Sequence, residues 1–272
     1  MQKMLKGKVA IITGAGSGIG FGIAKKFAEN GCNVVLNVHR ELKEYPGGAN
    51  RVKDIEAFGV KCLVVKADVS DSKQVANLVK KTTNLFRKVD IVVNNAALIP
   101  KEHVKHRRKL FDIPEEEWDK VLAVNLKGPF LLSKEVAPKM VEARYGRIIN
   151  ISAVSGISPL VNFAHYNASK AALNLLTKDM ALELAPFGVT VNCICPGLIR
   201  TEMAEGTAPE EMEADAYMDR FAKNAVPMQK PGYAEDIANA ALFFASNLGS
   251  YITGEVLVVA GGVPLMRSKL PE

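Results

Sequence analysis

The chain has 272 residues, of which 48% are hydrophobic and 24% charged, and its formal net charge is +6. This length is compatible with one large α/β domain. No apolar run approaches the roughly 18 residues that a membrane-spanning helix requires, and the basic residues lack the interleaved aromatic platform of a single-strand nucleic-acid binder. The sequence therefore argues against a membrane protein and a nucleic-acid-binding protein. The short apolar stretch near the N-terminus, followed at once by glycines, predicts a cytoplasmic location.

Strand-like runs alternate with helical runs along the chain. The strand-like runs are almost continuously apolar, which is typical of strands buried on both faces of a parallel sheet. The alternation predicts right-handed crossovers, and hence one doubly wound α/β domain over residues 1–272 with helices on both faces. The seven predicted strands span residues 8–13, 33–38, 61–68, 90–95, 146–152, 189–195 and 255–260.

The first predicted strand leads directly into a glycine-rich turn and a helix, in the stretch TGAGSGIG at residues 13–20. Glycine lets the backbone bend sharply and approach a pyrophosphate closely. In sheets of this kind the phosphate lies at a helix N-terminus, beyond the carboxyl ends of the strands. A glycine-rich turn without a ligand is the alternative, but the strand–loop–helix context favours phosphate binding.

The four cysteines are too few for a disulfide scaffold. Cys193 and Cys195 share one face of a predicted strand, and no neighbouring His or Cys completes a metal-ligand set. We interpret them as small core residues and predict no metal site.

Tyr166 and Lys170 lie in a run without Gly or Pro that ends before Pro186, which predicts a helix over residues 166–185. Residues i and i+4 lie above one another on a helix. An ammonium about 4 Å from a phenol lowers its pKa by roughly 3 units, toward neutral pH. Such a phenol both donates and accepts a proton, so the pair is a candidate acid–base catalyst. The alternative is an ordinary pair on a helix surface.

Several motifs in fixed order resemble the short-chain dehydrogenase/reductase family over essentially the whole chain. The run Thr13–Gly20 fits T-G-x-x-x-G-x-G, and residues 94–97 resemble the N-N-A-G element, although Ala97 stands where that family usually has Gly. Further along the chain the same family pattern is matched by Asn125, Ser152, Tyr166 with Lys170, and Pro196–Gly197 followed by Thr201.

The resemblance implies a Rossmann-type domain that transfers a hydride between a nicotinamide dinucleotide and a carbonyl or secondary alcohol. It implies that Tyr166 is the acid/base, that Ser152 polarises the carbonyl and that Asn125 holds a water linking Lys170 to solvent. A strand-end serine that bonds the backbone and a local kink at Asn125 are the alternatives, and the offset before Tyr166 favours Ser152 over Ser155. The implied cofactor residues are Gly14, Ser17, Gly18, Ile19, Gly20, His39, Arg40, Asp68, Val69, Asn95, Ala96, Ala97, Tyr166, Lys170, Pro196, Gly197, Ile199 and Thr201.

The end of the second predicted strand indicates which cofactor is preferred. NAD-selective proteins of this kind end that strand with an acid, whereas a nearby arginine accommodates a 2′-phosphate. Here Val38 takes the place of the acid, and His39 and Arg40 follow. The charge pattern therefore predicts NADP, with a protonated His39 assisting. NAD is the alternative if Asn37, backbone groups or Glu41 bind the ribose hydroxyls instead.

The substrate is left open by the sequence. Resemblance favours a 3-oxoacyl thioester reductase; a sugar, polyol or cyclic alcohol dehydrogenase and a non-catalytic nucleotide-binding sensor are the alternatives. The basic run at residues 101–109 is either a solvated loop or a lip that attracts anionic or carrier-bound substrates, and residues 200–226 resemble a substrate lid. The apolar helix over residues 166–185 is predicted to be buried, in the core or in the homotetramer that the resemblance implies.

Overall fold

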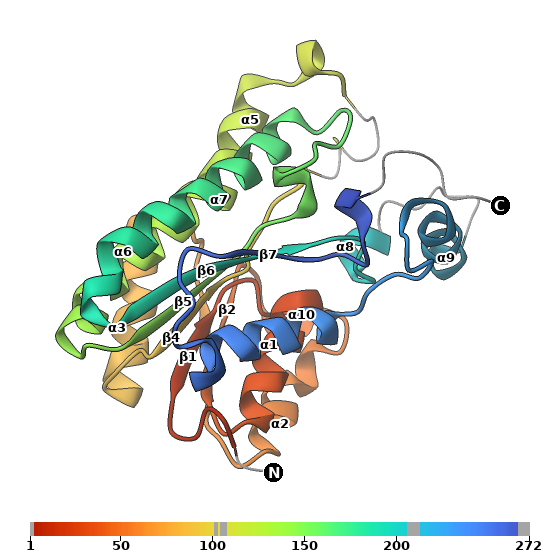
Figure 1. Cartoon of the computed structure of the whole chain (residues 1–272). Helices are drawn as coiled ribbons and strands as arrows, with labels where there is room; N and C mark the ends of the chain where they lie inside the picture. The colour runs from red at the N-terminus through yellow and green to blue at the C-terminus, as the bar shows by residue number, and fades with distance from the viewer. Residues whose placement is uncertain (1–2, 101–102, 104–107, 206–212, 266–272) are drawn as a thin grey trace.

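The protein is built around a seven-stranded parallel sheet in the order β3-β2-β1-β4-β5-β6-β7 (Figure 1). The computed structural model describes residues 3–100, 103, 108–205 and 213–265. The seven predicted strands and their parallel pairing are confirmed. The strands are β1 (Val9–Ile12), β2 (Asn33–Val38), β3 (Cys62–Lys66), β4 (Ile91–Asn94), β5 (Gly146–Ile151), β6 (Val189–Pro196) and β7 (Val256–Val259).

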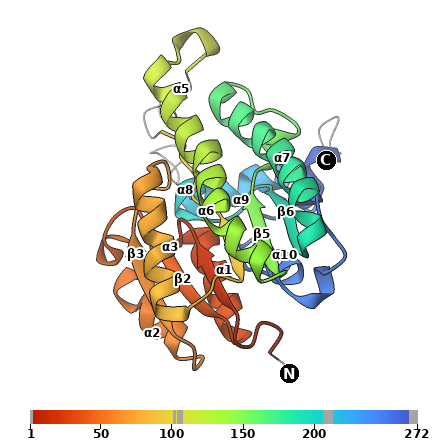
Figure 2. The same cartoon turned by 90° about the vertical axis from the view of Figure 1, so that its left-hand side faces the viewer.

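Helices cover both faces of the sheet. On one face lie α1 and α10 with α2; on the other, α3, α6 and α7 lie side by side (Figures 1 and 2). The helices are α1 (Gly18–Glu29), α2 (Arg51–Glu56), α3 (Ser72–Phe86), α5 (Glu115–Leu122), α6 (Gly128–Glu142), α7 (Ala164–Leu184), α8 (Glu202–Glu205), α9 (Ala214–Ala225) and α10 (Ala234–Ala245).

The continuously apolar strands follow from this two-sided cover. Successive side chains of a strand point to opposite faces. In β1, Ala10 and Ile12 pack into the core beneath α1 and α10, whereas Ile11 packs into the core beneath α3 and α6. Both faces are dry, so every position of the strand must be apolar.

The strand order reverses at β1. From β1 the chain first builds outward through β2 to β3, and then returns to place β4 on the other side of β1. A crevice forms at such a switch point, beyond the carboxyl ends of the two strands. The glycine turn follows β1 and the run of residues 94–97 ends β4, so the fold brings these two predicted motifs to one place.

The helix α7 is not buried on all sides. Leu175 and Leu182 are 62% and 78% exposed, whereas Leu173 and Ala181 are buried against the sheet. The helix therefore has the expected core face. Its outer face, predicted to be core or a subunit interface, is uncovered in the single chain, so only the interface stays a prediction. Among the described residues no helix is long and apolar enough to cross a bilayer.

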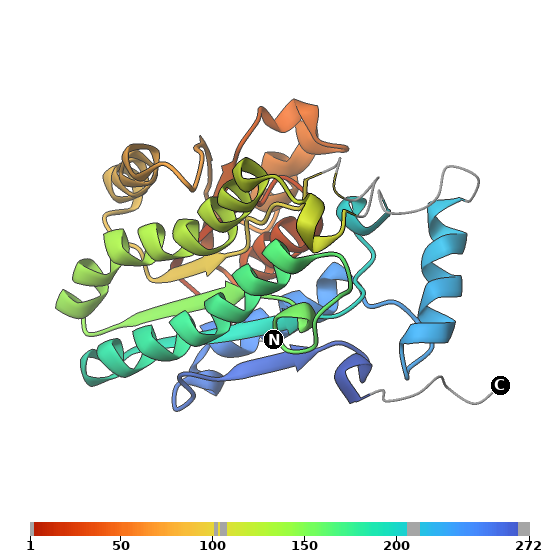
Figure 3. The same cartoon turned by 90° about the horizontal axis from the view of Figure 1, so that it is seen from above.

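The segment that follows β6 forms a separate small layer. Ile199 pairs with Gly232 in an isolated parallel bridge, and α8 and α9 lie at the end of the sheet toward which β6 and β7 point (Figure 3). Arg200 forms ion pairs with Asp215 and Asp219 of α9. This segment is the predicted lid; its residues 206–212 lie outside the described part of the chain.

Candidate active site

The glycine turn is fastened to the end of β4 by hydrogen bonds. The Thr13 hydroxyl accepts from the backbone N–H groups of Asn95 and Ala96, each at 2.9 Å. The Asn95 amide donates to the Thr13 carbonyl at 2.8 Å. Gly14 has φ +62°, which L side chains rarely adopt, and a Cβ added there would lie 2.9 Å from the Ala96 Cα. The T-G and N-N motifs are therefore two halves of one platform.

The rest of the turn forms the N-terminus of α1. Ser17 is the N-cap residue, and no acidic side chain occupies the first turn. A Cβ at Gly20 would lie 2.5 Å from both the Asn95 amide nitrogen and the Gly14 carbonyl oxygen. Helix N–H groups, a bare backbone and the absence of acids in that turn together suit a pyrophosphate.

Other predicted cofactor residues lie around the same crevice. Thr201 approaches the turn, since its side-chain methyl would be 3.5 Å from a Cβ at Gly18. Val69, after β3, packs against Gly128, whereas the Asp68 carboxylate accepts from the Ser70 N–H and hydroxyl. Ile19 packs on the core beneath α1, and Ala97 is partly exposed. At the end of β6, Pro196 is the last strand residue and the Gly197 N–H donates to the Val259 carbonyl. Ile199, which follows, is buried.

A tyrosine that the sequence analysis missed lies over the turn. A Cβ at Gly16 would be 2.5 Å from the ring of Tyr45, which is 7% exposed. The Tyr45 hydroxyl bonds His39 Nδ1 at 3.0 Å, and the Arg40 guanidinium lies 4.3 Å from the Tyr45 ring centroid. The only local signal was an aromatic residue inside a polar Pro-Gly-Gly segment, which does not reveal burial.

The charges at the end of β2 partly revise the cofactor prediction. Burial, and then the neighbouring Arg40, lower the pKa of His39, which opposes the predicted assistance from a protonated ring. Arg40 carries a permanent positive charge, and its Nε is buried and has no hydrogen-bond partner among the described residues. A buried, unpaired guanidinium nitrogen favours an anionic ligand.

Two of the three predicted substitutes for a ribose-binding acid have partners of their own. The Asn37 amide is 1% exposed and donates to the carbonyls of Val65 and Ala67. The Glu41 carboxylate pairs with Lys66 at 3.2 Å, in an exposed pair that a ligand can replace. Backbone groups are the third, so NAD stays the alternative. The glycine cradle and the unpaired Arg40 Nε fit a dinucleotide phosphate.

The ends of β5 and α7 bring together Ser152, Tyr166 and Lys170. Lys170 is 2% exposed, its ammonium donates to the Ile151 carbonyl at 2.8 Å, and it lies 5.6 Å from the Tyr166 ring centroid. Burial lowers the pKa of Lys170 to about 8 and raises that of Tyr166 to about 12. The predicted lowering of the tyrosine pKa was therefore wrong for this arrangement, because desolvation outweighs the attraction of an ammonium engaged with a carbonyl.

The Ser152 hydroxyl is also hydrogen-bonded to the backbone. It is 4% exposed and donates to the Lys170 carbonyl at 3.0 Å, which is the alternative interpretation of a strand-end serine. The hydroxyl oxygen still has both lone pairs with which to accept a hydrogen bond. Because a hydroxyl rotates readily, its hydrogen can also turn toward another acceptor. Ser155 is also buried, and its hydroxyl has no partner among the described residues.

Asn125 occupies a π-helical turn, Ala123–Lys127, between α5 and α6. Its side chain is fully buried: Oδ1 accepts from the Leu98 N–H at 2.7 Å, and Nδ2 donates to the Leu98 carbonyl and to the Ser169 hydroxyl. Asn125 thus holds the segment after β4 to α7. The predicted water between Asn125 and Lys170 stays a prediction, and the side chain of Asn125 bonds Ser169, the neighbour of Lys170.

Two features lie beside this site. Cys193 and Cys195 are fully buried, as predicted, and both thiols approach the Asn174 side-chain oxygen, at 3.4 and 3.6 Å. Of the basic run, residues 101, 102 and 104–107 lie outside the described part of the chain; Arg108 pairs with Glu117, and Lys109 lies over the Phe111 ring. The sequence analysis missed that His103 and Arg108 of this run both contact Glu117, which also bonds His165.

Comparisons with known proteins agree with this geometry. A family model described as enoyl-(acyl carrier protein) reductase matches residues 14–264. The 3-oxoacyl-[acyl-carrier-protein] reductase FabG of Rickettsia prowazekii is 38% identical over 259 residues, covering 95% of this chain and 98% of that protein. Human dehydrogenase/reductase SDR family member 4 is 35% identical over 261 residues, covering 96% and 88%.

A solved structure shares the whole architecture. The crystal structure of levodione reductase superposes with a TM-score of 0.86 at 30% identity, covering 95% of this chain and 98% of that one. Sequence motifs, strand order and relatives therefore agree, and the chain belongs to the short-chain dehydrogenase/reductase family of oxidoreductases, which act on CH–OH and C=O groups with a nicotinamide dinucleotide.

Proposed function

We propose that the protein is an NADP-dependent carbonyl reductase in which Tyr166 delivers the proton. The observation that carries the proposal is the placement of Ser152, Tyr166 and Lys170 beside the glycine cradle, at the carboxyl edge of the sheet. A nucleotide-binding sensor needs the cradle but none of these three side chains.

The cofactor supplies the hydride. In this proposal the turn at residues 14–20 holds its pyrophosphate, and Arg40 holds its 2′-phosphate. Ser152 turns its hydroxyl from the Lys170 carbonyl to the substrate oxygen, and Tyr166 gives that oxygen its proton. Because burial raises the pKa of Tyr166 to about 12, the phenol keeps its proton at neutral pH. A phenol that keeps its proton can serve as the donor that carbonyl reduction requires.

For the substrate we favour a 3-oxoacyl thioester, with sugar, polyol and cyclic alcohols as the competing class. The first is the substrate named for the Rickettsia relative, whereas the neighbouring solved structure is titled levodione reductase. Initial rates with a 3-oxoacyl thioester, cyclic ketones and sugar or polyol alcohols, each with NADPH/NADP⁺ and NADH/NAD⁺, test the proposal. Turnover of a carbonyl with NADPH supports it; dinucleotide binding without turnover of any of these compounds would indicate a sensor.

Charge reversal of the basic run separates the two substrate classes. Arg108 is held by Glu117, so the variant Arg107→Glu/Lys109→Glu leaves that pair intact. If the run attracts anions, KM for a CoA thioester rises a few-fold, to roughly tenfold at low salt, whereas KM for a neutral ketone is unchanged. The exposed pair Lys80→Glu/Lys81→Glu on α3 is the control. Equal effects on both substrates would indicate a solvated loop.

The homotetramer and the cytoplasmic location stay predictions. The exposed Leu175 and Leu182 give α7 an outer apolar face, which is the surface that a subunit contact would cover. Sedimentation of the purified protein tests the assembly.

A further inference from the structure

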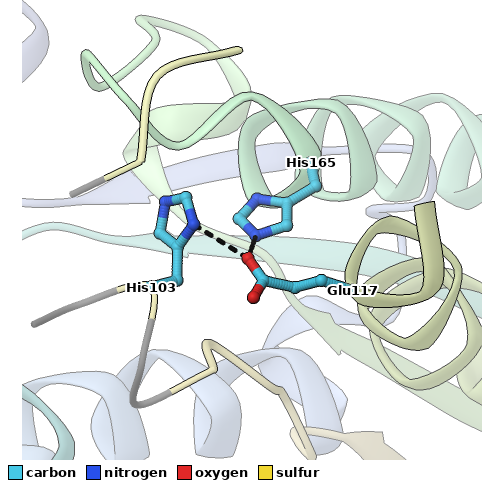
Figure 4. A group of neighbouring side chains, drawn as sticks. All are labelled: His103, Glu117 and His165. Carbon is cyan, nitrogen blue, oxygen red and sulfur yellow. Dashed lines mark hydrogen bonds and ion pairs between the residues drawn. The ribbon is translucent and has the colours of Figure 1, made fainter. Parts of the chain in front are cut away.

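A buried cluster of titratable side chains lies beside Tyr166. His103, Glu117 and His165 converge from three segments, with both rings directed at one carboxylate oxygen (Figure 4). Glu117 Oε1 is 2.9 Å from His103 Nδ1 and 3.2 Å from His165 Nε2. Both histidines are fully buried, and the Glu117 side chain is 10% exposed. Glu117 Oε2 accepts from Arg108 at 2.5 Å.

The state of His165 follows from its position on α7. The Tyr166 N–H belongs to the first turn of α7, where N–H groups lack a partner within the helix. It donates to His165 Nδ1 at 2.8 Å. Nδ1 is therefore an acceptor, so the neutral ring carries its proton on Nε2 and donates it to Glu117 Oε1. Burial and the nearby His103 lower the pKa of His165, which keeps this ring neutral.

The state of His103 follows in the same way. Its Nε2 lies 2.5 Å from the Asn162 carbonyl oxygen, which can only accept, so Nε2 carries a proton. Its other nitrogen faces Glu117 Oε1 at 2.9 Å. In a neutral His103 and an ionised Glu117 both of these atoms would be acceptors and would repel each other. One additional proton must lie between them.

A divalent metal ion is the other cation that could join these atoms, since the three ligand atoms lie within 4.8 Å of one another. Two contacts oppose it. Metal binding needs a lone pair on His165 Nε2, but that atom holds the ring proton while Nδ1 accepts from Tyr166. The guanidinium of Arg108 already pairs with the same carboxylate, which repels a second, doubly charged cation.

We propose that Glu117 is a positioning residue for Tyr166. Through the proton that it shares with His103 and the hydrogen bond that it accepts from His165, it fixes the first turn of α7, and so the direction of the Tyr166 side chain. This inference rests on the proposed catalytic role of Tyr166. The two neighbouring acids, Glu115 and Glu116, are exposed and take no part.

Nitrogen-15 NMR of the histidine rings tests the protonation states directly, because the chain has four histidines and each is assigned by one substitution. In the wild-type protein at neutral pH we expect His103 to be protonated on both nitrogens and His165 on Nε2 alone. A His103 ring with a single proton would overturn the proposal. Stoichiometric shifts of both rings on adding equimolar Zn²⁺ would overturn it in favour of a metal site.

Kinetics test the positioning. We expect Glu117→Ala to lower kcat about tenfold or more, with KM for NADPH within about twofold of wild type. Glu117→Gln retains part of kcat, since its amide still bonds one of the two rings. Glu116→Ala is the matched control and behaves as wild type. A Glu117→Ala variant with wild-type kcat would overturn the positioning role.

A parallel Tyr166→Phe variant separates this inference from the proposed function. If Tyr166→Phe is inactive and Glu117→Ala is unimpaired, only the positioning role fails. If Tyr166→Phe keeps full activity, the acid/base assignment fails whatever Glu117 does. Circular dichroism establishes that each variant is folded.

Discussion

The crevice at the strand switch point has a cofactor side and a chemical side, and the two are held in different ways. On the cofactor side the Thr13 hydroxyl and the Asn95 amide lock the glycine turn onto β4. On the chemical side the Ser152 hydroxyl donates to the backbone carbonyl of Lys170, and the Lys170 ammonium donates to that of Ile151. The cradle is thus preformed, whereas the reacting groups occupy resting positions.

The difference indicates which residues should affect ligand affinity and which should affect turnover. A preformed cradle loses little freedom when it binds, so its residues should affect affinity. Groups that must leave a backbone partner before they act should affect turnover. Substitutions on the two sides should therefore separate binding from chemistry.

The largest effect is expected on the chemical side. Tyr166→Phe removes the phenolic proton and keeps the ring, so kcat should fall about 10²–10⁴-fold, the range typical of general acid–base catalysis. Steady-state rates in the reducing direction measure it. A variant with near-normal kcat would show that the proton comes from elsewhere.

The next effect is expected on the cofactor side. In Gly20→Ala the new Cβ would lie 2.5 Å from the Asn95 amide nitrogen and the Gly14 carbonyl oxygen, so the turn must shift. We expect kcat/KM for the cofactor to fall about 10²-fold. Gly59→Ala is the control: its φ is +78°, which Gly20 does not share, and the space around its Cβ is open. An unchanged Gly20→Ala variant would contradict the preformed cradle.

On the cofactor side, Arg40 is expected to distinguish NADPH from NADH. Because its Nε is unpaired, Arg40→Ala should weaken NADPH binding by about 1–3 kcal/mol and leave NADH binding unchanged. Fluorescence titration with both cofactors measures this. The exposed Lys43→Ala is the control for general attraction. Equal losses for both cofactors, or a wild-type protein that prefers NADH, would remove the case for NADP.

The smallest effect is on stability, through the buried Lys170. Its pKa is lowered from 10.5 to about 8 in the folded protein. Between these values the unfolded chain binds a proton that the folded one has lost, so the free energy of unfolding should rise with pH, by at most about 1.4 kcal/mol per pH unit. Lys170→Met lacks this rise. Urea unfolding of both proteins between pH 8 and 10 checks it; parallel curves would mean that Lys170 titrates normally.

Particular residues show how far the sequence predicts this molecule. The strands were predictable because their two-sided burial makes them continuously apolar, as in Val9–Ile12. The glycine turn was predictable because its backbone requirements are local. Long-range contacts could not be predicted from the sequence. Tyr45 contacts Gly16 because the fold brings two separate segments together. The pKa of Tyr166 depends on desolvation, which residue spacing does not reveal.

Glu117 is an intermediate case. Acids favour the positive N-terminal end of a helix, which accounts for Glu115 and Glu116, both exposed at the start of α5. Glu117 lies one turn before the buried Val121, on the inward face of α5. That periodicity was a usable signal for a buried carboxylate, although its histidine partners could not be read from it.

The most direct test of the central claim measures binding and turnover together. NADPH dissociation constants and kcat are determined for the wild-type protein, Tyr166→Phe and Gly20→Ala. We predict that Tyr166→Phe binds NADPH within about threefold of wild type and is almost inactive, whereas Gly20→Ala binds it about 10²-fold more weakly. A Tyr166→Phe variant that has lost NADPH binding, or that turns over normally, would contradict the division of the crevice into a preformed cofactor side and a separate chemical side.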